Sequence, residues 1–140
     1  MNALLRPLPA LTDHKALRLA TLALLYCAQG LPIGLFQVAI PAYMASLGMT
    51  AAEVGGFIAF VFLPWSFKLV AGPIMDRFTF APMGNRRPWV LFAQSGLLLS
   101  FALLALLHPE PASHYWYLAG LGFLSNVFSA LQDVAVDGLA

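Results

Sequence analysis

Four long apolar stretches dominate this sequence. They cover about residues 19–47, 54–75, 89–107 and 115–140, and each reaches the roughly 18 to 20 residues that an α-helix needs to cross ~30 Å of hydrocarbon. Only 9% of the residues are charged, which is too few to solvate a globular surface. Lipid cannot satisfy free backbone groups, and the stretches lack strict two-residue alternation. The sequence therefore predicts an all-α membrane protein with four transmembrane helices.

The positive charges are distributed unevenly between the ends of these helices. The connections near residues 48–53 and 108–114 contain Glu53 and Glu110 but no lysine or arginine. Because lysine and arginine are enriched on the cytoplasmic side, we expect a multi-pass protein of the cell (inner) membrane with a cytoplasmic N-terminus. The positively charged residues on the cytoplasmic side are Arg6, Lys15, Arg18, Arg77, Arg86 and Arg87.

Cofactor and nucleic-acid functions have little support in the composition. The only cysteine, Cys27, allows no intramolecular disulfide and no cysteine metal cluster. The net charge is +1, and no basic stripe suggests a nucleic-acid partner. We therefore predict no cofactor, no metal site and no nucleic-acid binding.

A polar stripe runs along the fourth apolar stretch. Asn126, Ser129, Asp133 and Asp137 follow one another at spacings of three, four and four residues, with Gln132 beside them, so they share one face of a helix. A lipid-facing stripe of this kind is prohibitive, and the face must contact protein or a water-filled cavity. The asparagine, serine and glutamine are candidates to line a cavity, although a hydrogen-bonded packing seam explains them equally well.

Lys68 lies inside the second apolar stretch and needs an acidic partner. Counting about 1.5 Å per residue from Asp76 places Lys68 about 12 Å inside the cytoplasmic boundary. Asp133 is the best available acid, because Glu53 and Glu110 lie on the opposite side of the membrane and Asp76 belongs to the loop. Two roles remain open for this pair, a static ion pair and a proton-coupling site. Asp137 is a further candidate for this site, although it lies so close to the interface that water alone could solvate it.

The first apolar stretch carries a weaker polar stripe. Tyr26, Gln29, Ile33 and Gln37 fall within about a quarter of the helix circumference at 100° per residue. Two glutamines in an apolar span suggest a cavity wall, although hydrogen bonds to another helix would explain them as well.

A charged segment connects the second and third stretches. It contains Gly72-x-x-x-Asp76-Arg77 and then Gly84-x-Arg86-Arg87, and it resembles the loop between the second and third helices of major facilitator superfamily transporters. The resemblance implies that the aspartate pairs with neighbouring helix ends and that the arginines lock the loop in one of the alternating states. The chain departs from the pattern by inserting residues 79–83.

Further motifs narrow the resemblance to one branch of that superfamily. They are Gln29-Gly-Leu-Pro-Ile-Gly34, Ile40-Pro-Ala-Tyr43, Leu63-Pro-Trp-Ser-Phe-Lys68, Ala71-Gly-Pro-Ile-Met-Asp76, Arg86-Arg-Pro-Trp89 and Gln132-Asp-Val-Ala-Val-Asp-Gly138. Together they are similar to AmpG-type muropeptide permeases and acetyl-coenzyme A transporters. The resemblance implies about twelve helices, alternating access, a cavity lined by the first and fourth helices, and a bulky, polar or anionic small-molecule solute.

On this resemblance, we expect residues 1–140 to be the N-terminal portion of a longer, proton-coupled transporter. Its partners would then be the solute, the lipid bilayer and the remainder of the transporter. One alternative is a small four-helix transporter acting as a dimer, but such chains carry an acid in the first helix and this one does not. Another is a structural membrane subunit, which would not need Lys68 or Asp133. An enzyme is disfavoured, because Asp133 and Asp137 lack the further carboxylates that a metal-dependent transferase requires.

Overall fold

The computed structural model describes residues 14–78 and 86–138. Four helical spans, Lys15–Ser46, Ala51–Arg77, Arg87–Leu107 and Tyr115–Asp137, are each long and apolar enough to cross a membrane. The described residues contain no strand. The prediction of an all-α membrane fold with four transmembrane helices is therefore confirmed.

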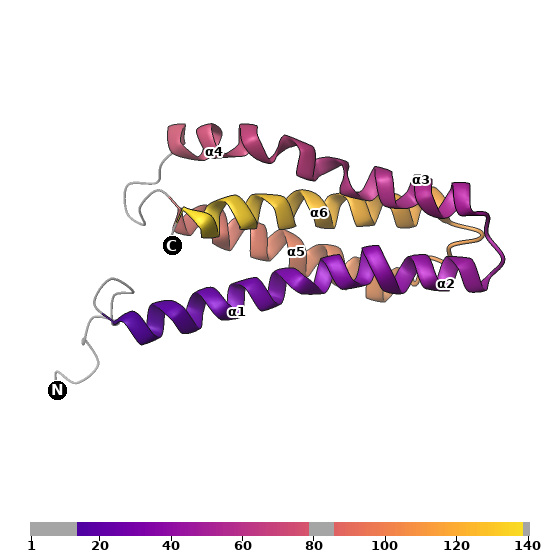
Figure 1. Ribbon diagram of the computed structural model, residues 1–140, viewed down its shortest axis with the longest axis horizontal. Coiled ribbons are helices and arrows are strands. Elements are labelled where there is room, and N and C mark those ends of the chain that lie inside the picture. The colour runs from indigo at the N-terminus through magenta and orange to yellow at the C-terminus, as the bar shows by residue number, and fades with distance from the viewer. Residues whose placement is uncertain (1–13, 79–85, 139–140) are drawn as a thin grey trace.

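The fourth span, α6 (Tyr115–Asp137), lies at the centre of the bundle (Figure 1). It contacts each of the other three spans, and twelve of its 23 residues are buried. The connections 47–50 and 108–114 lie at one end of the bundle, whereas the start of the first span and the ends of the second and fourth lie at the other (Figure 1). The second and fourth spans consequently run parallel to each other.

The first span is not a uniform α-helix. It consists of α1 (Lys15–Ile33), the π-helical turn η2 (Gly34–Ala39) and α2 (Ile40–Ser46). Pro41 has no N–H to donate to the carbonyl of Gln37, and its ring crowds that carbonyl. The chain widens there, and Ile40 donates its N–H to the carbonyl of Leu35 instead. Side chains beyond the wide turn are rotated away from the positions that a regular helix predicts.

The second span is interrupted by a 3₁₀ segment. It comprises α3 (Ala51–Phe62), η3 (Leu63–Phe67) and α4 (Lys68–Arg77). Pro64 cannot donate an N–H to the preceding turn, and the Leu63 N–H bonds to the Phe60 carbonyl in the tighter 3₁₀ pattern. As a result, Lys68 is the first residue of a new α-helical segment.

The second span also begins earlier than the expected residue 54. The Thr50 hydroxyl accepts the Glu53 N–H at 3.3 Å, and the Glu53 carboxylate accepts the Thr50 N–H at 2.7 Å. This reciprocal capping box satisfies two free N–H groups at the helix start. The Thr-x-x-Glu spacing that signals it is present in the sequence, so the earlier start could have been predicted.

Apolar and polar side chains occupy different ends of the bundle. The buried apolar core packs near the two short connections and consists of Phe36, Met44, Phe57, Val61, Leu118 and Ala119. Gly122 allows the helices to approach closely there, since a Cβ on it would lie 2.9 Å from Val61 and 3.0 Å from Phe36. Toward the other end, α6 buries polar residues instead, and these form the candidate site. The third span, α5 (Arg87–Leu107), packs along α6.

Candidate functional site

Five side chains from three helical segments meet in the half of the bundle away from the short connections. Lys68, at the start of α4, forms an ion pair with Asp133 of α6, and its Nζ lies 3.4 Å from Oδ2 of Asp137. From α1, Gln29 donates to Oδ1 of Asp133 at 2.6 Å, and Tyr26 donates its hydroxyl to Oδ1 of Asp137 at 2.6 Å. We name these five residues the charge cluster.

Helix geometry explains why these residues can meet. Asp133 and Asp137 are four residues apart on α6, and Tyr26 and Gln29 are three apart on α1, so each pair presents two neighbouring groups on one helix face. Lys68 reaches both carboxylates from the third helical segment, α4. The cluster thereby ties the first, second and fourth spans together.

The three charged groups differ in exposure within the described part of the chain. The Asp133 side chain is 11% exposed, that of Lys68 is 37% exposed and that of Asp137 is 48% exposed. Asp137 is therefore half-exposed, as its position near the interface suggested, but it is also bound to Tyr26 and lies beside Lys68. Two carboxylates face one ammonium group, so the cluster carries a net charge of −1 when all three are ionised.

The remaining polar residues of α6 are fully buried. Asn126 accepts the indole N–H of Trp65 at 2.9 Å and donates to the Gly122 carbonyl at 2.9 Å. Gln132 donates to the Leu25 carbonyl of α1 at 3.3 Å, and Ser129 is buried beside them. Within the described residues, these contacts favour the packing-seam interpretation for Asn126 and Gln132. The Ser129 hydroxyl and the Gln132 amide oxygen are buried there without a hydrogen-bond partner, and a cavity-lining role for Ser129 stays a prediction.

The two glutamines of the first span lie in different environments. Gln29 is buried against Asp133, whereas Gln37 is exposed. Gln37 lies within the π-helical turn, which breaks the 100° periodicity on which the expected stripe was based. The hydrogen bond of Gln29 fits the interhelical alternative, and a cavity-lining role for Gln37 stays a prediction.

The charged connection after α4 is described only in part. Asp76 and Arg86 form an ion pair at 2.6 Å, and Arg86 also points a guanidinium N–H at the Met75 sulfur at 3.6 Å. The Arg86 side chain lies against Gly138 at the end of α6, where a Cβ would come within 2.7 Å of its Nε. Arg86 therefore joins the ends of the second and fourth spans.

The other members of the predicted conformational loop lie in α4 and at the start of α5. Gly72 faces Val134 of α6, and a Cβ on this glycine would lie at an ordinary van der Waals distance of 3.9 Å from the valine side chain. Arg77 and Arg87 are exposed. Gly84 and the insertion at residues 79–83 lie outside the described residues. The locking role of the arginines stays a prediction.

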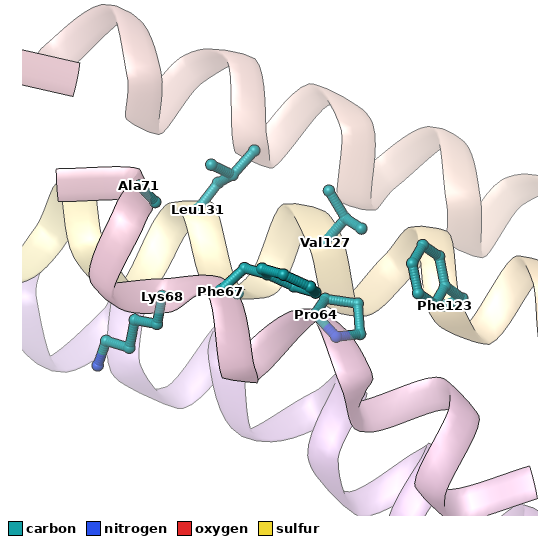
Figure 2. A pocket seen from close by; sticks show the side chains of 8 residues that line it. Pro64, Phe67, Lys68, Ala71, Phe123, Val127 and Leu131 are labelled. Carbon is teal, nitrogen blue, oxygen red and sulfur yellow. The ribbon is translucent and has the colours of Figure 1, made fainter. Parts of the chain in front are cut away.

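An apolar groove of about 140 Å³ lies beside the break in the second span. Figure 2 shows Pro64 and Phe67 of η3 and Ala71 of α4 on one side, and Phe123, Val127 and Leu131 of α6 on the other. The amine of Lys68 is directed away from these side chains (Figure 2). Lys68 is the only one of the lining residues with a polar side chain, so the groove is a poor candidate for binding a polar solute.

Comparison with known proteins identifies the family. The family described as "Acetyl-coenzyme A transporter 1" matches residues 18–140. The chain belongs to this family. The expected likeness to acetyl-coenzyme A transporters is thereby confirmed, and individual relatives confirm the likeness to AmpG-type permeases.

Two curated relatives each align with most of this chain. The "Anhydromuropeptide permease" of Escherichia coli K12 is 33% identical over 120 residues, which cover 86% of this chain and 24% of the permease. The "Putative transporter AmpG 3" of Rickettsia prowazekii is 27% identical over 128 residues, which cover 89% of this chain and 30% of that protein. The chain thus spans about a quarter to a third of the length of these relatives. No solved structure matches it.

Proposed function

We propose that this chain forms the first four helices of a secondary active transporter that carries a bulky, polar or anionic solute by alternating access. The proposal is supported by the family match and by the names of the relatives, which include a permease for anhydromuropeptides. Muropeptides and acetyl-coenzyme A are both large polar molecules, and either class fits the proposal. The asymmetry of lysine and arginine supports a cytoplasmic N-terminus.

We further propose that the charge cluster couples solute movement to a proton. The observation that carries this step is the ion pair between Lys68 and Asp133 inside a membrane-spanning bundle. Ionisable groups in membrane helices are costly, and they commonly mark ion or proton pathways. Because the cluster contains one more carboxylate than ammonium groups, binding one proton would bring it to neutrality.

The competing interpretation is that the same pair is a static tie between the second and fourth spans. Both interpretations require Lys68 and Asp133 to be close, so proximity does not distinguish them. The surplus carboxylate, Asp137, favours the coupling role, since a purely structural ion pair needs only one acid.

The transport proposal is tested with the full-length gene product in proteoliposomes. Uptake of a radiolabelled anhydromuropeptide and of acetyl-coenzyme A is measured with and without an imposed proton gradient. Saturable uptake of one of them, accelerated by an inward proton gradient, is the expected result. Equal uptake with and without the gradient would reject proton coupling. If neither solute is taken up, the proposed solute class is rejected.

A further inference from the structure

Two of the polar contacts that join the second and fourth spans follow one another along both helices, at the break in the second span. The first is the hydrogen bond from the Trp65 indole to Asn126, and the second is the ion pair between Lys68 and Asp133. Both spans run in the same direction, so the donors and the acceptors occur in the same order. Both donors must therefore leave the second span on the face that contacts α6.

The 3₁₀ conformation of η3 supplies this alignment. Residues three apart eclipse each other in a 3₁₀-helix, whereas in an α-helix they are about 60° apart. Trp65 lies within η3, and Lys68, three residues later, is the first residue after η3. The two side chains therefore leave the backbone on nearly the same face. On α6, Asn126 and Asp133 are seven residues apart and differ by only about 20° in direction.

The spacing along the helices is also compatible. Three residues of 3₁₀-helix rise about 6 Å, and seven residues of α-helix rise about 10.5 Å. The flexible stem of Lys68 can cover the remaining distance of about 4.5 Å toward Asp133. The indole of Trp65, which has a rigid ring, is therefore the contact that fixes the height of η3 on α6.

Asn126 is itself held firmly in place. It is fully buried, and its amide N–H group donates to the Gly122 carbonyl one turn earlier, which leaves the amide oxygen directed at the indole. Just before the break, the absence of a side chain at Gly122 lets Val61 approach α6 closely. The second span is thus anchored on both sides of Pro64.

From this geometry we propose that Asn126 is a positioning residue for the charge cluster: by accepting the Trp65 N–H it fixes the rotation and height of η3 and so sets Lys68 against Asp133. Neither Asn126 nor Trp65 needs to touch solute or proton. The effect on uptake rests on the proposed function, whereas the effect on the ion pair does not.

The test uses the full-length gene product with Trp65→Phe, which keeps the aromatic ring and removes the N–H, and with Asn126→Leu, which removes the acceptor. Each change is expected to lower proton-driven uptake by about two- to ten-fold, the range that corresponds to one hydrogen bond. The double variant is expected to be no worse than the single ones. Trp116→Phe, at an exposed tryptophan of α6, is the matched control and is expected to leave uptake unchanged.

A positioning role is separated from simple packing by repeating Trp65→Phe in a Lys68→Met/Asp133→Asn background. If the bond acts through the ion pair, Trp65→Phe lowers the melting temperature of the purified protein less than half as much in this background as in the native one. An equal decrease in both backgrounds would overturn the inference, because the bond would then contribute only packing.

A second measurement does not depend on the double background. Displacement of Lys68 in Trp65→Phe is expected to raise the acylation of Lys68 by a water-soluble amine reagent, quantified by mass spectrometry. Unchanged acylation would also overturn the inference. If the native protein shows no uptake while acylation and melting behave as expected, the proposed function fails and the positioning role stands.

Discussion

Removing Lys68 should destabilise the protein more than removing the charge of Asp133. In Lys68→Met, Asp133 keeps its charge, and within the described residues its remaining side-chain partner is the Gln29 amide. In Asp133→Asn, Lys68 keeps its charge but still has Asp137, whose Oδ2 lies 3.4 Å away. The charge that remains therefore has an oppositely charged partner in Asp133→Asn but not in Lys68→Met.

The difference in exposure sets the expected magnitudes. The Asp133 side chain is only 11% exposed, so stranding its charge should cost close to the full value for a broken buried pair, about 3 to 5 kcal/mol. The Lys68 side chain is 37% exposed, and solvent screening together with its second partner should reduce the cost of stranding it to about 1 to 2 kcal/mol. The double change Lys68→Met/Asp133→Asn strands no charge and should come within about 1 kcal/mol of the native protein.

These values can be measured by reversible unfolding of the full-length gene product in mixed micelles, followed by tryptophan fluorescence. Lys15→Met, at an exposed lysine at the start of α1, controls for the general loss of a positive charge. Equal losses for the two single variants, or a larger loss for Asp133→Asn, would refute the reasoning from exposure. The double variant also separates the two roles of the pair: if transport recovers together with folding, the pair is static, and if only folding recovers, Asp133 carries the proton.

Three further outcomes are expected. Gly122→Ala should lower the free energy of unfolding by about 1 to 3 kcal/mol relative to Gly120→Ala, because a Cβ at Gly122 would lie 2.9 Å from a valine methyl of α3 while nothing lies within 4 Å at Gly120. Cysteines introduced at Thr50 and Ser113 in a cysteine-free background should react with an impermeant maleimide only from outside the cell, and labelling only from the cytoplasm would reject the topology. His108→Gly should raise the free energy of unfolding by about 0.5 to 1 kcal/mol, because His108 ends α5 with φ 40°; an unfolding titration measures it, and a decrease would contradict the argument.

The number of spans could be predicted from the sequence, because it depends on properties of each segment alone. The length of an apolar stretch and its flanking charges determine whether a helix can cross the membrane. The ends were less accurate: the first span begins at Lys15 and the second at Ala51, several residues before the expected positions. For the second, the capping residues Thr50 and Glu53 carried the missing information.

The irregular turns could not be predicted in the same way. Pro41 and Pro64 both indicate an interrupted helix, yet the first is preceded by a wide π-helical turn and the second lies in a tight 3₁₀ segment. Which one forms depends on the contacts that compensate for the missing N–H, and these come from other helices. This is why the exposure of Gln37 beside a buried Gln29 was not foreseen, and why the alignment of Trp65 with Lys68 was not foreseen either.

The charge cluster was only partly accessible from the sequence. Lys68 and Asp133 could be matched because they are at similar depth, whereas Glu53 and Glu110 lie toward the opposite side of the membrane. The bonds from Tyr26 and Gln29 to the two aspartates were not inferred, since the rotation of α1 relative to α6 is not encoded in either helix alone. The polar stripe on each helix did indicate which of its faces avoids lipid.

The second acid gives the cluster a property that a single ion pair lacks. In the proposed cycle, a proton that neutralises Asp133 removes the charge that holds Lys68, but Asp137 lies one turn further along α6, within 3.4 Å of the same amine. Lys68 can therefore change partner without becoming an unpaired charge at that depth, and the large cost of stranding it is avoided. Since Tyr26 binds Asp137 and Gln29 binds Asp133, such a change of partner would alter the contacts between α1 and α6. This links the protonation of one carboxylate to the packing of two helices that the family resemblance assigns to the cavity wall.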